Sequence, residues 1–114
     1  MATSYSILGQ QQPTGSNVDL YVCPAATDTV VSTIAITNVT SSAATATIYV
    51  RKATGTTAQA ASTANALAYN VPIAANTFQT VTIGMTLTAY DTVTVASGTS
   101  GALTFHAFGS KVTA

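Results

Sequence analysis

The side chains with the greatest capacity for catalysis are the single cysteine, Cys23, and the single histidine, His106. Together with Asp91 they would supply the nucleophile, base and orienting carboxylate of covalent catalysis if the fold brought them together. The flanking residues argue against this arrangement. Cys23 lies between Val22 and Pro24, at the expected end of a strand, and no cationic neighbour in the sequence would stabilise a thiolate there.

The surroundings of His106 also favour a structural role. It lies between Phe105 and Ala107, a context typical of a strand histidine that makes one structural hydrogen bond. We therefore expect no catalytic residues and no enzymatic activity.

The three carboxylates, Asp19, Asp28 and Asp91, are far apart in the sequence and do not form a calcium-binding or glycosidase-type pattern. Asp28 and Asp91 lie in predicted turns, where a carboxylate accepts backbone N–H bonds. The sequence has no phosphate-binding glycine loop, no CxxC pair and no HExxH motif. We expect neither a metal site nor a cofactor.

Charge is sparse along the 114 residues: 3 Lys and Arg balance 3 Asp and Glu, and only 5% of positions are charged. Nucleic-acid binding requires several phosphate-neutralising cations, and anionic membranes attract clusters of basic residues. Arg51-Lys52 is the only basic pair and is typical of a solvated strand end. We therefore expect no nucleic-acid partner and no membrane partner.

The lone cysteine and the first ten residues indicate the cellular compartment in which the chain folds. Cys23 cannot form a disulfide within the chain, which favours folding in a reducing cytoplasm. Met1–Gln10 has neither a basic nor a long apolar region, so we expect no export signal, and no apolar run is long enough for a membrane span.

The residues that must position these side chains are strongly β-favouring. The chain has 23 Thr, and a branched Cβ restricts χ1 and packs well on a pleated surface. Apolar residues alternate with polar ones in short runs separated by turns. The expected inward sets are Val18, Leu20 and Val22; Val30, Ile34 and Ile36; Ala46, Ile48 and Val50; Leu67, Tyr69, Val71 and Ile73; Val81, Ile83 and Met85; Val93 and Val95; and Leu103, Phe105 and Ala107.

With Ser4–Leu8 these runs give about eight strands and no βαβ spacing. The sequence therefore predicts an all-β fold, an antiparallel β-sandwich that is immunoglobulin-like or a jelly roll. Pro72 lacks a ladder donor and indicates an edge strand. Gly84 indicates a possible bulge in the strand predicted over Thr77–Met85.

Two segments interrupt the alternation. Residues 1–16 form an N-terminal arm, able to add to the sheet edge of a neighbouring subunit, or an ordinary first strand, and residues 17–114 form a single sandwich domain. Ala53–Ala66 is a long, small-residue segment with a possible helical turn around Gln59–Ala64. It is expected to be either a contact loop or a mobile loop.

Several short pieces, in their order along the chain, carry a resemblance to a known group of proteins. They are Leu8-Gly9-Gln10, Leu20-Tyr21-Val22-Cys23-Pro24-Ala25, Val30-Val31-Ser32-Thr33-Ile34, Tyr69-Asn70-Val71-Pro72-Ile73, Asn76-Thr77, Leu87 with Asp91, and Phe108-Gly109-Ser110-Lys111. From about Leu8 to Lys111 the chain resembles small β-sandwich structural proteins of tailed bacteriophages.

The resemblance implies a non-enzymatic virion protein that decorates or cements the capsid, made and folded in the cytoplasm of a bacterial host. Its implied partners are the major capsid protein or other virion proteins, and a homo-oligomer is expected, with a trimer as the first expectation. The alternative is a tail, neck, baseplate or fibre component that joins virion parts or binds host glycans, with Tyr49, Tyr69 and Tyr90 as stacking candidates.

The candidate interface residues come from two regions of the sequence. They are Tyr5, Ile7 and Leu8 in the arm, Thr57 and Gln59 in the long loop, and Tyr49 and Arg51 on the outward side of the preceding strand.

Overall fold

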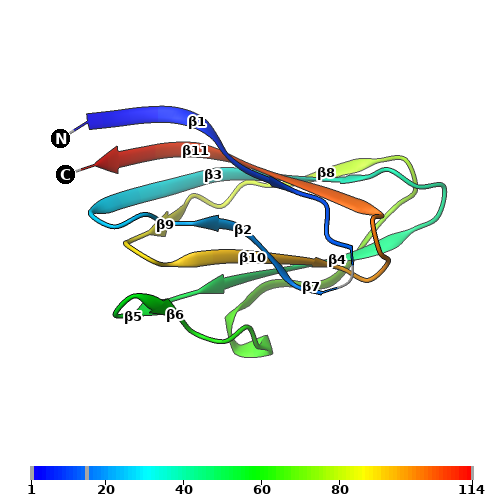
Figure 1. Cartoon of the computed structure of the whole chain (residues 1–114). Coiled ribbons are helices and arrows are strands. Elements are labelled where there is room, and N and C mark those ends of the chain that lie inside the picture. Colours follow the sequence, from blue (N-terminus) through cyan, green and yellow to red (C-terminus); the bar gives the residue numbers. More distant parts are fainter. Residues whose placement is uncertain (1, 15, 114) are drawn as a thin grey trace.

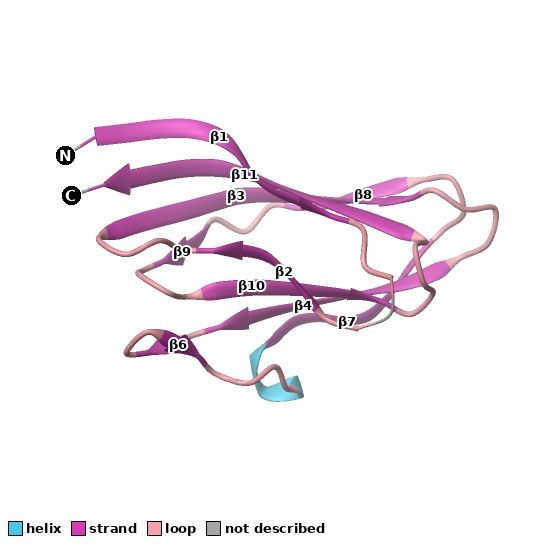
Figure 2. Ribbon diagram, viewed as in Figure 1, coloured by secondary structure: helices cyan, strands magenta, loops and turns pink. Residues whose placement is uncertain are grey.

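The computed structural model describes residues 2–14 and 16–113, and almost all of its regular structure is β-strand (Figure 1, Figure 2). Met1, Gly15 and Ala114, which belong to the predicted segments 1–16 and 17–114, lie outside the described residues. The strands form two packed antiparallel sheets, so the predicted all-β sandwich is confirmed.

The sheets contain five and four strands. Sheet A has the order β1–β11–β3–β8, with β9 also paired to β3, and comprises β1 (Ala2–Gln11), β3 (Thr27–Asn38), β8 (Phe78–Val81), β9 (Met85–Leu87) and β11 (Leu103–Thr113). Sheet B has the order β2–β10–β4–β7 and comprises β2 (Val18–Val22), β4 (Ala44–Arg51), β7 (Ala66–Ile73) and β10 (Thr92–Ser97).

The strand order is that of a jelly roll. β4 pairs with β7, β3 with β8 and β9, β2 with β10, and β1 with β11, so the chain folds as nested antiparallel pairs. Successive pairs alternate between sheet B and sheet A. Of the two architectures expected from the sequence, this order matches the jelly roll.

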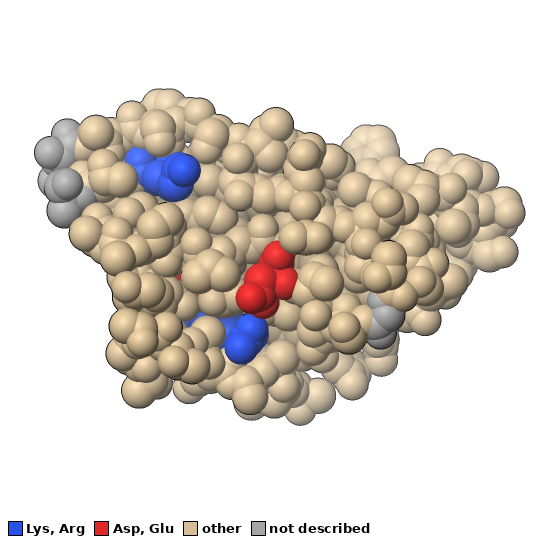
Figure 3. Space-filling model, viewed as in Figure 1, with Lys and Arg blue, Asp and Glu red and all other residues tan. Residues whose placement is uncertain are grey.

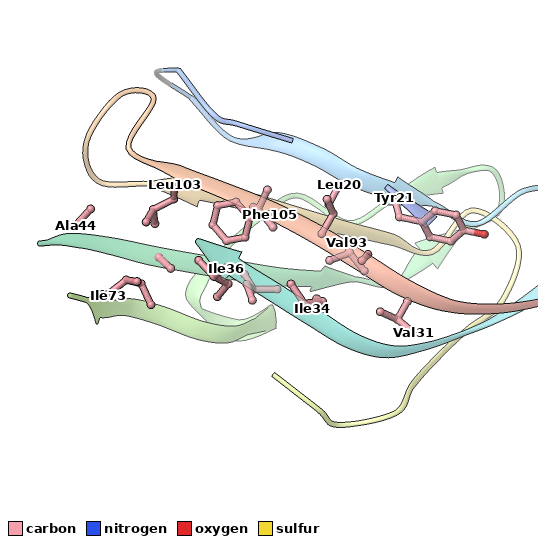
Figure 4. Packing of buried hydrophobic residues seen from close by; sticks show 14 of the residues in the cluster. Leu20, Tyr21, Val31, Ile34, Ile36, Ala44, Ile73, Val93, Leu103 and Phe105 are labelled. Atoms are coloured by element: carbon pink, nitrogen blue, oxygen red, sulfur yellow. The ribbon is translucent and has the colours of Figure 1, made fainter. Parts of the chain in front are cut away.

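The core lies between the sheets and receives side chains from both (Figure 4). Phe105 and Ile34 from sheet A, and Ile48 and Val93 from sheet B, are fully buried. Burial of such a side chain stabilises the fold by roughly 1.5–3 kcal/mol. The burial of Ile48, Val93 and Phe105 confirms the predicted inward direction of these side chains in β4, β10 and β11.

In β3 a bulge changes which valine faces the core. Thr33 pairs with Phe108 and Val31 with Gly109, which leaves Ser32 as an extra residue. Because one extra residue reverses the alternation, Val31 is 1% exposed whereas Val30 is 39% exposed. The predicted inward position of Val30 is therefore wrong.

A second bulge lies in β2. Val93 pairs with Tyr21 and Thr94 with Asp19, so Leu20 is the extra residue. Leu20 and Tyr21 are both buried, and Val22, predicted to point inward, is exposed.

β7 contains a similar irregularity. Its register with β4 shifts between Val71 and Ala68, and Asn70 has a φ of 51°. Ala68 therefore packs against the core, while Leu67 and Tyr69, predicted to face inward, are exposed. β7 ends sheet B, as Pro72 predicted.

The single strand predicted over Thr77–Met85 is two strands. β8 and β9 both pair with β3 but are separated by Thr82–Gly84, where Gly84 has a φ of 74°. Ile83 lies in this interruption and is exposed, contrary to its predicted inward position.

The segment Ala53–Ala66 has regular structure. β5 (Ala53–Thr54) and β6 (Thr57–Ala58) form a hairpin, and a 3₁₀ helix, η1 (Thr63–Asn65), follows. The helical turn overlaps the C-terminal part of the one expected from the sequence.

Candidate interaction surface

The face of sheet A that points away from the core carries apolar side chains. In β11, Phe105 and Ala107 are buried, so the alternation directs Phe108 outward. Ile7 of β1 lies opposite Phe108 in the antiparallel register. Ile7 is 58% exposed and Phe108 is 37% exposed, so this cross-strand pair lies open to solvent.

The same face continues onto the strands on either side. Ser110 of β11 pairs with Tyr5 of β1 and with Val30 of β3, so both side chains flank a small residue. Tyr5 is 84% exposed. At the far end of the sheet, Phe78 of β8 pairs with Thr37 and is 69% exposed. We call Tyr5, Ile7, Val30, Phe78 and Phe108 the sheet A apolar face.

A shallow groove of about 350 Å³ runs across this face. Tyr5, Val30 and Phe108 line it together with small residues of β1, β3 and β11, including Gly109 and Ser110. A groove bordered by aromatic and branched side chains with small residues between them can accept an apolar side chain of a partner.

Phe108 is held in place by its neighbours. Its ring stacks on His106, with 6.2 Å between ring centroids and an interplanar angle of 9°. The Gln10 side-chain amide lies 3.0 Å from Nδ1 of His106. This contact agrees with the structural role expected for His106.

Charged groups add little to the surface (Figure 3). Arg51 forms an ion pair with Asp19, with 3.2 Å between Nη1 and Oδ1, and also donates to the Thr94 hydroxyl at 3.1 Å. Thr94 donates in turn to Asp19 at 2.9 Å. This cluster ties β2, β4 and β10 together in sheet B, so Arg51 is already engaged within the chain.

The predicted loop candidates lie in the β5–β6 region. Arg51 Nε donates to the Gln59 carbonyl at 2.6 Å, and the Gln59 N–H donates to the Lys52 carbonyl at 2.9 Å. Thr57 is exposed within the hairpin. Ala53 N donates to Asp91 at 2.8 Å, which fixes the start of the hairpin.

The structure divides the seven candidate interface residues. Tyr5 and Ile7 belong to the sheet A apolar face, whereas Leu8 lies in a bulge between Ile7 and Gly9 and packs against the core. Of the other four, Tyr49 and Arg51 lie in β4 of sheet B, Thr57 lies in β6, and Gln59 directly follows β6. Of the stacking candidates, Tyr69 is well exposed, while Tyr49 and Tyr90 are half-buried.

The three residues considered for catalysis have separate structural contacts. Cys23 is fully buried, and its Sγ lies 3.2 Å from the Thr27 carbonyl and 3.3 Å from the Thr29 hydroxyl. His106 instead contacts Gln10 and Phe108. The expected role of Cys23 as a small buried thiol is confirmed.

Asp91 has the turn role expected of it. Its carboxylate accepts N–H bonds from Ala53 at 2.8 Å and Thr88 at 3.0 Å and also accepts the Thr88 hydroxyl. Burial raises the pKa of Asp91, but these hydrogen bonds and nearby Lys52 together outweigh it, so the pKa lies below its ordinary value. An ionised carboxylate is therefore built into this junction.

Residues 2–14 and 16–113 contain no group of three or more His, Cys, Asp or Glu residues suited to hold a metal ion. Within the same residues, no helix has the length and apolar character needed to cross a membrane.

Sequence reasoning did not select Phe108, Val30 or Phe78 as interface candidates. The alternation in β11 already directed Phe108 away from the core, so an outward aromatic residue was the available signal. Val30 was hidden by the bulge at Ser32. For Phe78 the same signal was available, because the alternation placed it on the face opposite Val81.

Comparisons with known proteins match this chain to solved structures at low sequence identity. No protein-family model and no curated protein matches the chain. It is similar to a chain in the structure of infectious bursal disease virus, Gx strain, with a TM-score of 0.48 and 17% identity over 96% of this chain and 30% of that one. A chain of the Gt strain structure gives a TM-score of 0.42 and 18% identity over 96% and 28%.

This chain therefore spans about 30% of the length of the viral chain from the Gx strain.

Proposed function

We propose that this chain is a non-enzymatic structural protein of a virion, and that it decorates or cements the capsid of a tailed bacteriophage. Its partners are the major capsid protein or other virion proteins. The observation that carries the proposal is the sheet A apolar face, an open surface of aromatic and branched side chains on a domain with almost no free charge.

The composition of this face supports docking rather than chemistry. Exposed apolar side chains gathered on one face of a domain are typical of interaction sites. The side chains able to do chemistry make structural contacts instead: Cys23 with Thr29, and Asp91 with Ala53 and Thr88. The fold supports the proposed virion role by analogy alone, since jelly rolls occur in both viral capsid and lectin domains.

Many copies on one particle would make a weak contact sufficient. When several copies are linked, later contacts form at a high effective concentration, so the assembly binds far more tightly than one domain. A neutral apolar surface also makes this binding insensitive to salt, in contrast to binding through ion pairs.

The proposal is tested by adding purified protein to particles that lack it and measuring bound copies after sedimentation. The docking variant carries Val30→Ser and Phe108→Ser, and the matched control carries Leu67→Ser and Tyr69→Ser on sheet B. We expect the docking variant to lose most of its occupancy and the control to retain it. Equal occupancy of the two variants would overturn the role of this face.

The copy number of the native particle separates the two virion roles. A number comparable to that of the major capsid protein supports decoration, whereas a far smaller number places the chain in the tail, neck, baseplate or a fibre. Absence of the chain from purified particles would overturn a virion role altogether.

A further inference from the structure

The free edge of β1 is unusually open to strand pairing. β1 ends sheet A and pairs with β11 on one side only. An edge strand directs the N–H and C=O groups of alternate residues away from its neighbour, where they can pair with another strand. From Ala2, opposite Thr113, to Ile7, opposite Phe108, the register is unbroken. This stretch contains neither a charged residue nor proline.

The edge strands of sheet B carry features that oppose strand addition. β2 is short, has a bulge at Leu20 and carries the charged residue Asp19. β7 contains Pro72, and Asn70 adopts a positive φ. Proline, charge and bulges are common means of protecting sheet edges.

The opposite edge of sheet A is protected by interruption. β8 and β9 are short, and Thr82–Gly84 separates them. Among residues 2–14 and 16–113, β1 is therefore the one long sheet edge with a straight, uncharged stretch. Ala2–Ile7 is the segment of the fold best suited to accept another strand.

We propose that β1 pairs antiparallel with β1 of a second copy of this chain and joins the two A sheets across a two-fold axis. Any antiparallel strand edge can pair with its own copy, which meets the self-complementarity that a two-fold contact demands. With no charge in Ala2–Ile7, pairing brings no like charges within this stretch together. The inference concerns contacts between copies and stands independently of the proposed virion role.

The pairing has a preferred parity of register. Tyr5 and Ile7 point to the outer face, so a register with odd-numbered residues opposite odd-numbered residues brings both apolar faces to the same side. Tyr5 then lies opposite Ile7 of the second copy or opposite its own counterpart. The sheet A apolar face becomes continuous across the dimer.

The protected edges also favour a dimer over the trimer expected from the resemblance. A ring formed by strand addition needs two different edges, one from each neighbouring copy. β2, β7 and the interrupted β8–β9 edge are poor acceptors for the reasons given above. The edge of β1 is thus paired with itself.

The test uses charge exchange on the full chain. Ser4 and Ser6 are exposed β1 residues. Within the chain they lie opposite Lys111 and Gly109 of β11. The lysine variant carries Ser4→Lys and Ser6→Lys, and the glutamate variant carries Ser4→Glu and Ser6→Glu. A control carries Ser41→Lys and Ala43→Lys in an exposed turn remote from β1.

Sedimentation equilibrium then measures the mass of each protein and of an equal mixture of the two variants. We expect the native chain and the control to be dimers of the 11.5 kDa chain. Each variant alone is expected to be monomeric because like charges meet across the two-fold axis, and the mixture is expected to be dimeric. The carboxylate introduced by Ser4→Glu lies beside Lys111, and this local attraction opposes the repulsion between the two introduced carboxylates of one chain.

A native monomer, a native trimer, or a dimer insensitive to either variant would overturn the proposal, as would a mixture that stays monomeric. A second measurement remains valid if both variants fold poorly. Ser6→Cys, treated with a short bismaleimide, is expected to give a covalent dimer, because Cys23 is fully buried and does not compete. Ser41→Cys is expected to stay monomeric, and equal cross-linking of the two would overturn the proposal.

Discussion

Ile7 and Phe108 lie directly opposite each other on β1 and β11, and both side chains point to solvent. The same strand pair buries Phe105 on its other face. Sheet A therefore carries a set of apolar side chains on each face. One set completes the core, and the other is left exposed by residues 2–14 and 16–113. This second set is the basis of the proposed docking function.

We expect removal of an aromatic ring to lower the free energy of unfolding by different amounts on the two faces of sheet A. Phe105→Ala leaves a cavity in a fully buried site and is expected to lower the free energy of unfolding by about 3–5 kcal/mol. Phe78→Ala removes a ring that is 69% exposed and is expected to cost less than about 1 kcal/mol. Urea unfolding of both variants measures the difference, and equal losses would contradict the assigned faces.

Cys23 is expected to be unreactive in the native protein. Its thiol is fully buried and lies 3.3 Å from the Thr29 hydroxyl, so a thiol reagent reaches it only when the surrounding strands open. Labelling with a chromogenic disulfide should therefore be slow without denaturant and complete after unfolding. Rapid labelling of the folded chain, with the far-ultraviolet spectrum unchanged, would show that the site is open.

The lowered pKa of Asp91 predicts that the folded chain loses stability in acid. Its pKa is lower in the folded chain than its ordinary value of about 3.8, so the ionised form favours folding at pH values above that value. This contribution declines as the pH falls below about 3.8 and is lost once the pH passes the lower, folded-state pKa.

Asp91→Asn is expected to be less stable than the native chain at neutral pH and to lose part of this acid dependence. Asp28→Asn is a matched control, since Asp28 is exposed. Urea unfolding from about pH 7 down to pH 3 measures both. Parallel stability curves for the native chain and Asp91→Asn would contradict the assigned hydrogen bonds.

Arg51 is expected to hold the β5–β6 hairpin. Its Nε donates to the Gln59 carbonyl at 2.6 Å, so Arg51→Ala removes a tie between β4 and the residue after β6. Hydrogen exchange should become faster for the amides of Thr57–Gln59, while the core strands remain protected. Lys52→Ala serves as the comparison, and equal exchange in the two variants would show that the arginine contact is dispensable.

The fold class could be predicted because alternation is local. The buried positions of Ile48, Val93 and Phe105 follow from a period of two in uninterrupted strands. Val30 and Val22 were misassigned because each follows or precedes a bulge, and one extra residue reverses every later side chain. A bulge depends on the partner strand, which local sequence does not reveal.

The choice between the two sandwich architectures also depended on long-range pairing. The register of Ala2 with Thr113 joins residues at opposite ends of the chain, and no local pattern specifies it. For the same reason, only part of the candidate surface could be predicted. Tyr5 and Ile7 were selected from the arm, but the β1–β11 register was needed to place Phe108 beside them.

Electron cryo-microscopy of the particle that carries this chain tests the central claim most directly. The account predicts a jelly-roll density on the capsid with Phe108 and Val30 against the neighbouring virion protein. Density in which these two side chains face bulk solvent, while sheet B contacts the capsid, would contradict it.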